Sequence, residues 1–257
     1  MKRLVLYLFA SLLTVISSSA QENYEIQVYG SATQAVKQTI SEIHSNYTAQ
    51  GEKKIVEGVF PSHRAWHKTI EITHGIAKNF ETGIYFFTNY TPGQGWKLIG
   101  FHLRPRWAAP QYWNLPVGVS VSAEIGWQQA AYAAETFSLE LRPIFDKTID
   151  KLYISFNPTL GFGFKGVGAS SSPAIAPSFK LAYSASKKIS LGTEYYSELG
   201  SFKKIAPLAQ EQHALFVVAD LFVDPKWEIN FGAGKGLTQA TDGLVLKLLL
   251  GRRIQWK

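Results

Sequence analysis

Apolar residues alternate with small or polar ones along much of this chain, most clearly in the stretch LPVGVSVSAEIGWQ at positions 115–128. From Val117 to Trp127 every second residue is apolar, and the residues between them are glycine, serine or glutamate. Successive side chains of a β-strand point to opposite faces, so a period of two predicts a strand with one apolar face. The pattern alone does not say whether that face meets a protein core or a lipid.

Similar runs follow one another along the chain, each bounded by turn residues. A tilted strand of about ten residues crosses a bilayer, whereas strands of globular domains usually have about five or six. After the N-terminal region no stretch approaches the roughly 18 consecutive apolar residues of a membrane-spanning helix. We predict about twelve strands of about ten residues, at positions 38–48, 65–76, 80–90, 96–106, 116–128, 134–145, 151–161, 177–185, 188–198, 212–223, 226–235 and 243–256.

The links between these runs alternate in length. This alternation is typical of outer-membrane barrels, which have short periplasmic turns and longer outer loops. We therefore predict an all-β fold, a transmembrane up-and-down antiparallel β-barrel of about twelve strands over residues 36–257. The link at 107–115 is long where a short turn is due, and its three aromatic residues are expected to be interfacial anchors. The short links are 77–79, 146–150, 186–187 and 224–225, and the long ones include 49–64, 162–176 and 199–211.

The N-terminus has the three parts of a secretory signal peptide: the basic MKR, the apolar LVLYLFASLLTVI and the small-residue exit SSSA. We predict cleavage after Ala20, so residues 1–20 form the signal peptide. A membrane anchor is disfavoured because a spanning helix needs about 20 apolar residues. Residues 21–35 are expected to form a periplasmic N-terminal segment, and the exported chain is expected in the outer membrane of a Gram-negative envelope.

Composition narrows the class of protein further. The chain has no cysteine, so it forms no disulfide and offers no site for a lipoprotein anchor. Removing Lys2 and Arg3 with the signal peptide lowers the formal charge from +7 to +5, a mild excess without the concentrated basic patch of a nucleic-acid-binding protein. The expected partners are outer-membrane lipid and lipopolysaccharide, the outer-membrane assembly machinery and a small solute, with no nucleic acid and no cofactor.

The C-terminal run GLVLKLLLGRRIQW carries Gly251, followed by Ile254 and Trp256 at alternating positions. This arrangement resembles the C-terminal targeting signal of outer-membrane barrels. It departs from that signal at Leu249, where a polar residue is usual, and in having Lys257 after the aromatic residue.

Nearly the whole mature chain resembles an uncharacterised family of bacterial outer-membrane β-barrel proteins. The resemblance implies a transmembrane barrel and carries no catalytic or ligand residues. It rests on EIQVYGS (25–31), EIHSNYT (42–48), AWHKTIEITHGI (65–76), FETGIYFFT (80–88), PGQGW (92–96), RPR (104–106), PVGVSVSAEIGWQ (116–128), LELRPIFDK (139–147), FNPTLG (156–161), EYYSELG (194–200) and WEINFGAGKGLT (227–238).

Residues that alternate with the outward apolar positions are expected to face the lumen. A charged residue on the lipid face near the membrane centre costs about 2–4 kcal/mol, so charges on the strands are assigned inward. The pattern indicates an ion-pair network that fills the barrel or selects a solute. The candidate lumen-lining or binding residues are Glu71, Glu81, His102, Arg104, Arg106, Glu124, Glu140, Arg142 and Asn157.

Chemistry beyond permeation finds little support in the sequence. A metal site is disfavoured because His67 and His74 have opposite parity on one strand. Outer-membrane phospholipase is also a twelve-stranded barrel and uses a His-x-Ser pair on one strand, whereas here Ser45 directly follows His44 and would point to the other face. We predict a monomeric narrow channel or binding barrel for a small solute. The alternatives are a membrane-embedded hydrolase acting on lipid and a structural or surface-interaction barrel.

Overall fold

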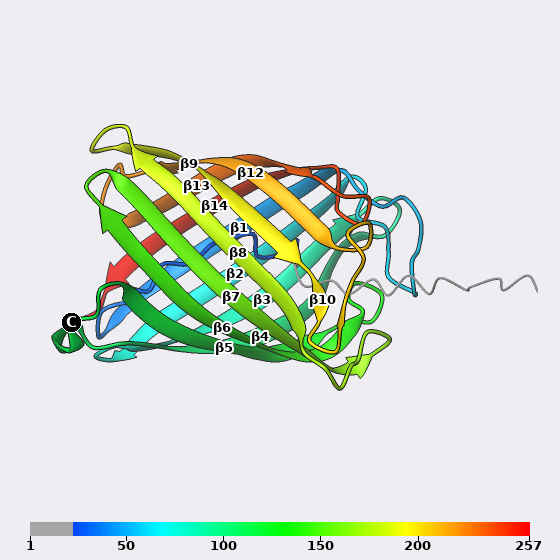
Figure 1. Ribbon diagram of the computed structural model, residues 1–257, viewed down its shortest axis with the longest axis horizontal. Coiled ribbons are helices and arrows are strands. Elements are labelled where there is room, and N and C mark those ends of the chain that lie inside the picture. Colours follow the sequence, from blue (N-terminus) through cyan, green and yellow to red (C-terminus); the bar gives the residue numbers. More distant parts are fainter. Residues whose placement is uncertain (1–22) are drawn as a thin grey trace, which may run out of the picture.

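The computed structural model describes residues 23–257 and shows a closed barrel of twelve antiparallel strands (Figure 1). The barrel closes where β1 pairs with β14, the last strand of the chain. Every other wall strand pairs with the wall strands before and after it in the sequence. The wall strands are β1 (Gln38–Gln50), β2 (Ala65–Ala77), β3 (Phe80–Thr91), β4 (Gly95–Ala108), β5 (Gly118–Gln128), β6 (Glu135–Ile149), β7 (Leu152–Gly166), β8 (Ala174–Ser184), β9 (Ile189–Glu198), β12 (Gln212–Leu221), β13 (Trp227–Gly236) and β14 (Leu244–Gln255).

All twelve runs predicted from period-two alternation are therefore strands, with ends that shift by a few residues. The largest difference concerns β6 and β7, which have 15 residues each. Most of the short link expected at 146–150 belongs to β6, and the long link expected at 162–176 shrinks to 167–173. The expected signal peptide, residues 1–20, lies outside the described residues.

The barrel has a turn end and a loop end, at the left and right of Figure 1. The turn end holds the short links, the beginning of β1 and the end of β14. Asn79 and Asp150 take a positive φ in two of these tight turns, a conformation that the short polar side chains of Asn and Asp tolerate. The loop end holds the links at 51–64 and 167–173 and the link at 199–211, which contains the small hairpin β10 (Gly200–Ser201) and β11 (Lys204–Ile205).

Apolar side chains cover the outside of the barrel. On β5, Val121, Ile125 and Trp127 are exposed, whereas Ser122 and Glu124 between them are buried. A soluble sandwich would bury the apolar face and expose the polar one. So large an apolar exterior needs a lipid environment. Within residues 23–257, no helix has the length and apolar character needed to cross a membrane.

The long link at the turn end folds into the short 3-10 helix η1 (Gln111–Trp113). Its Trp113 ring packs 5.5 Å from the ring of Trp107, and Tyr112 is exposed beside it. These aromatic side chains therefore project at one rim of the barrel. Their role as interfacial anchors stays a prediction.

Candidate functional site

The chain segment before β1 runs through the inside of the barrel from the loop end to the turn end. At the loop end, the Asn23 amide donates a hydrogen bond to Asp242, 2.8 Å away, and the Asn46 amide donates to the Asn23 carbonyl, also at 2.8 Å. At the turn end, the Ala35 carbonyl packs against Gly75, where a Cβ atom would lie only 2.0 Å from it. We call residues 23–35 the lumenal segment.

We expected residues 21–35 to form a periplasmic segment. For residues 23–35, which the structure describes, the path through the lumen corrects this expectation. The physical reason lies in the segment's own side chains. Ile26 and Val28 are buried in one apolar cluster with Phe216 of β12, and Tyr24 is buried in another with Phe87 of β3. Both clusters lie inside the barrel, so the interior supplies the apolar contacts that the periplasm lacks.

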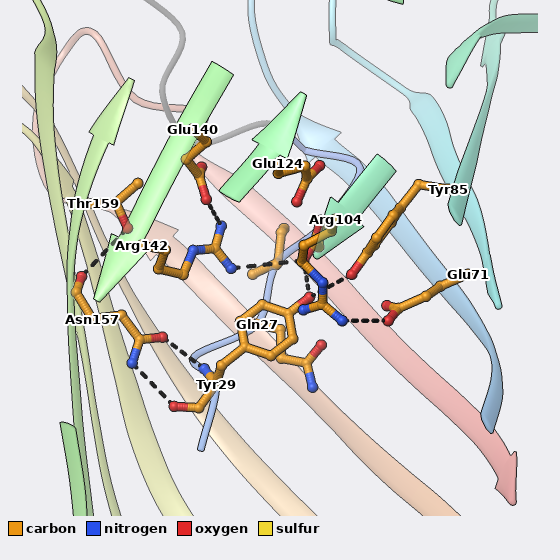
Figure 2. A network of polar contacts seen from close by, with 12 residues as sticks. Gln27, Tyr29, Glu71, Tyr85, Arg104, Glu124, Glu140, Arg142, Asn157 and Thr159 are labelled. Atoms are coloured by element: carbon orange, nitrogen blue, oxygen red, sulfur yellow. Dashed lines mark hydrogen bonds and ion pairs between the residues drawn. The ribbon is translucent and has the colours of Figure 1, made fainter. Parts of the chain in front are cut away.

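Tyr29 anchors the segment at mid-lumen. Its backbone N–H donates to the Asn157 side-chain oxygen over 2.7 Å, and its carbonyl accepts hydrogen bonds from Ser155 at 2.6 Å and from Asn157 at 3.0 Å. Its hydroxyl is hydrogen-bonded to Glu25. Figure 2 shows the ring lying between arginines that come from β4 and β6.

Those arginines hold the ring by cation–π contact. The guanidinium carbons of Arg104, Arg142 and Arg106 lie 4.7, 4.8 and 5.7 Å from the centroid of the Tyr29 ring. A guanidinium within about 6 Å of an aromatic centroid is attracted by the ring's quadrupole, more strongly where both groups are desolvated. The ring thus connects two walls of the barrel that are separate in sequence.

The first of these walls carries a buried network on β2, β3 and β4. Arg104 lies 2.8 Å from Glu71, and Arg106 lies 2.8 Å from Glu81. Glu71 also lies 3.2 Å from the His44 ring nitrogen. Arg106 donates in addition to the carbonyls of Gly30 and Ala32, so it fixes the backbone of the lumenal segment.

A second network on β8, β9, β12 and β14 holds the other side of the segment. Lys247 lies 2.5 Å from Glu194 and donates to the Ile26 carbonyl over 2.8 Å. Lys180 lies 3.1 Å from Glu194 and 2.9 Å from Asp220. These buried charges are paired and hydrogen-bonded, as burial requires.

A third network, on β4, β5 and β6, is less tightly packed. Arg142 lies 2.6 Å from Glu140 and 3.7 Å from Glu25 of the segment. Glu124 lies 2.7 Å from His102 through one carboxylate oxygen, while its other oxygen is buried without a hydrogen-bond partner among the described residues. Beside these groups is a cavity of about 100 Å³, the small cavity.

A larger cavity of about 700 Å³, the vestibule, lies at the loop end. It is bounded by the beginning of the lumenal segment, by the inner ends of the strands and by the loops at 51–64 and 237–243. Glu135, the first residue of β6, lines both the vestibule and the small cavity. The two spaces are therefore neighbours along one side of the segment.

The structure places all nine candidate residues on the inner face, but it divides them into groups. Arg104 and Arg142, expected in one ion-pair network, have different acidic partners and meet only around the Tyr29 ring. The sequence analysis missed Lys247, although a lone lysine at inward parity in an apolar strand was a usable signal. It also missed Glu25 and Tyr29, because it placed their segment outside the barrel.

The geometry also bears on the hydrolase and metal-site alternatives. His44 is buried in the lumen, whereas Ser45 lies on the opposite face of β1, as their adjacent positions predict. The histidine contacts Glu71 and does not point toward the serine. Across residues 23–257, no group of three or more histidine, aspartate or glutamate side chains is arranged to hold a metal ion.

Comparison with known proteins places this geometry in a wider context. No protein-family model matches the chain, and no curated protein sequence matches it. An outer membrane channel from Pseudomonas putida F1 superposes with a TM-score of 0.60 at 12% identity, over 90% of this chain and 100% of that chain. The chain has the fold of a bacterial outer-membrane barrel.

Two porins show the same likeness at lower scores. The KdgM porin, in complex with disordered oligogalacturonate, superposes with a TM-score of 0.52 at 10% identity, over 85% of this chain and 99% of that chain. The NanC porin gives a TM-score of 0.51 at 8% identity, over 84% and 99% of the two chains. At these identities the similarity concerns the fold alone.

Proposed function

We propose that the protein is a narrow outer-membrane channel for a small solute, in which the lumenal segment forms the constriction. The observation that carries this proposal is the pair of neighbouring cavities beside the segment, which share Glu135 in their linings. A barrel that served only as a structural element would gain stability from filling such space, because empty volume forfeits packing contacts.

The size of the lumen fits this function. Barrels of about eight strands are filled by side chains, and those of about sixteen hold an open water channel. A twelve-stranded barrel lies between these limits, and here the lumenal segment occupies much of the remaining space. The small cavity of about 100 Å³ has room for a few water molecules, so we expect a low conductance.

The charges along this route favour cations over anions. Among residues 23–257, the small cavity is lined by the four acidic side chains of Glu25, Glu124, Glu135 and Glu140 and by one guanidinium, that of Arg142. An excess of negative charge in a narrow space with low-dielectric walls raises the local concentration of cations. We therefore expect the open channel to conduct potassium in preference to chloride.

Planar-bilayer recording of the refolded full-length mature protein tests the proposal. We expect discrete, small conductance steps and a reversal potential of cation-selective sign in a potassium chloride gradient. Swelling of liposomes in small sugars or amino acids would extend the result to neutral solutes. Absence of both conductance and swelling, with the barrel shown to be folded by its heat-dependent gel mobility, would contradict the proposal and favour a structural role.

A further inference from the structure

The vestibule has an unusual lining for a channel entrance, because amide side chains are abundant in it. Five glutamines and two asparagines line it, among them Gln50, Gln128 and Gln239. An amide group offers two donor hydrogens and an acceptor oxygen. This combination matches a solute hydroxyl, which also donates and accepts.

Aromatic rings form the second part of the lining. Phe60 and Tyr132 come from two different loops, and their ring centroids lie 5.3 Å apart. The Phe60 backbone N–H donates to the Ala131 carbonyl over 2.8 Å, which ties the two loops together. Deeper in the vestibule, Tyr24 and Phe216 present further rings. The electron-rich face of an aromatic ring suits the polarised C–H groups on one face of a sugar ring.

A buried donor deeper in the vestibule lacks a partner. Asn89 lies 3.2 Å from His67 and donates its amide hydrogen to the Nδ1 atom of the ring. This bond makes Nδ1 an acceptor, so the ring proton of the neutral histidine is on Nε2. His67 is only 5% exposed, and its Nε2 atom is buried without a hydrogen-bond partner among residues 23–257. His67 lines the vestibule, so a ligand hydroxyl that reached this edge of the ring would satisfy the donor.

We propose that the vestibule is a binding site for an uncharged polyhydroxylated solute of the size of a short oligosaccharide. This inference rests on the proposed channel function, because the vestibule is the entrance of that channel, and it adds a class of ligand that binds at the entrance. The cavity volume of about 700 Å³ falls within the roughly 300–1,000 Å³ typical of ligand sites. Its lining combines amide groups, aromatic faces and the unpaired histidine donor.

The charges of the lining exclude acidic solutes. Glu52, Glu57, Glu135 and Asp242 line the vestibule, and Lys54 is its single lysine within the described part of the chain. A carboxylated sugar entering this space would meet an excess of like charge. The site therefore discriminates neutral oligosaccharides from their uronic-acid counterparts.

Isothermal titration calorimetry of the refolded full-length mature protein in detergent micelles tests this site. The probes are the neutral trimers of glucose, mannose and N-acetylglucosamine, compared with a trimer of glucuronic acid. We expect at least one neutral trimer to bind with a Kd of about 1 mM or tighter, and the acidic trimer to bind at least about tenfold more weakly. Tyr132→Ala should weaken binding of the neutral trimer at least about fivefold, while Tyr132→Phe retains most of it.

The matched control is Phe202→Ala, which truncates an exposed aromatic residue of the loop end that lines neither cavity. This variant should bind like the unmodified protein. The inference is overturned if no neutral trimer binds, if the acidic trimer binds equally well, or if Phe202→Ala weakens binding as much as Tyr132→Ala. Calorimetry requires no conduction, so binding without conductance would contradict only the proposed channel, and conductance without binding only this inference.

Discussion

The guanidinium of Arg142 lies 4.8 Å from the centroid of the Tyr29 ring, joining the barrel wall to the segment that fills the lumen. Arg104, from another part of the wall, lies 4.7 Å from the same centroid. The Tyr29 ring therefore links two ion-pair groups, that of Arg104 and that of Arg142, which make no direct contact with each other. The lumenal segment is a structural element of the barrel interior, bonded to the wall at both ends and at its centre.

Truncating Tyr29 tests the importance of this anchor. Tyr29→Ala should lower the free energy of unfolding by about 3–5 kcal/mol, the range for truncating a large buried aromatic residue. Tyr29→Phe keeps the ring between the arginines and loses only the hydrogen bonds of the hydroxyl, to Glu25 and, at 3.5 Å, to the Tyr85 hydroxyl, so its effect should be clearly smaller. Urea titration of the barrel in lipid vesicles, followed by tryptophan fluorescence, measures both. Equal losses in the two variants would show that the arginine–ring contacts contribute little.

The two arginines should differ in their response to removal. Arg104 and its partner Glu71 have side chains that are 2% and 1% exposed, so Arg104→Ala leaves a desolvated carboxylate and should cost about 3–5 kcal/mol. Arg142 and Glu140 are 12% and 25% exposed beside the small cavity, where water reaches them. For Arg142→Ala we expect a loss of about 1–2 kcal/mol. The same urea titration measures both losses of unfolding free energy. A larger loss for Arg142→Ala than for Arg104→Ala would mean that the small cavity is dry.

Neutralising a carboxylate of the small cavity should change ion selectivity. Glu140→Gln replaces one of the four acidic side chains along the proposed route with a neutral one, so the reversal potential in a potassium chloride gradient should move toward that of a less cation-selective channel. Asp150→Asn is the control, because it removes one negative charge in a turn away from both cavities. An identical shift in both variants would indicate a general surface-charge effect and would count against the route.

The C-terminal residues have both a targeting and a structural interpretation. Ile254 is exposed on the outer face, and the Trp256 indole donates a hydrogen bond to Thr39 across the β1–β14 seam over 2.7 Å. Replacing both residues with aspartate should strongly reduce the amount of barrel in the outer-membrane fraction. Trp256→Phe keeps the hydrophobic character and loses the seam bond, so it should insert normally. Poor insertion of the phenylalanine variant would show that the hydrogen bond at the seam, and not the signal, is what matters.

Much of the wall was predictable from the sequence, and for a clear reason. Period-two alternation along a strand fixes which side chains share a face, so once the apolar face is assigned to lipid, residues such as Glu81 and Arg106 must point inward. Both are buried on the inner face. The link lengths likewise indicated which ends of the strands meet, although β6 and β7 extend farther than their turn residues suggested.

The contents of the lumen were not predictable in the same way. The run EIQVYGS (25–31) alternates like a strand, yet it is buried on several sides by side chains from distant parts of the sequence. Alternation carries no information about whether such a segment lies inside or outside a barrel. The pairing of Arg142 with Glu25 depends on that placement. The sequence therefore indicated that the Arg142 side chain is charged and points inward, but not that Glu25 is its partner.

The segment before β1 passes through the lumen and reaches the loop end. Cysteines at positions 23 and 242, introduced into the cysteine-free chain, should be joined by a short bifunctional thiol reagent in the folded barrel, because Asn23 and Asp242 are in contact. The matched pair at positions 23 and 150 should remain unjoined, since Asp150 lies at the turn end, roughly 30 Å away across the membrane. Mass spectrometry of the digested protein detects the linked peptides. A link between positions 23 and 150 without one between 23 and 242 would place the segment at the periplasmic side and contradict the account.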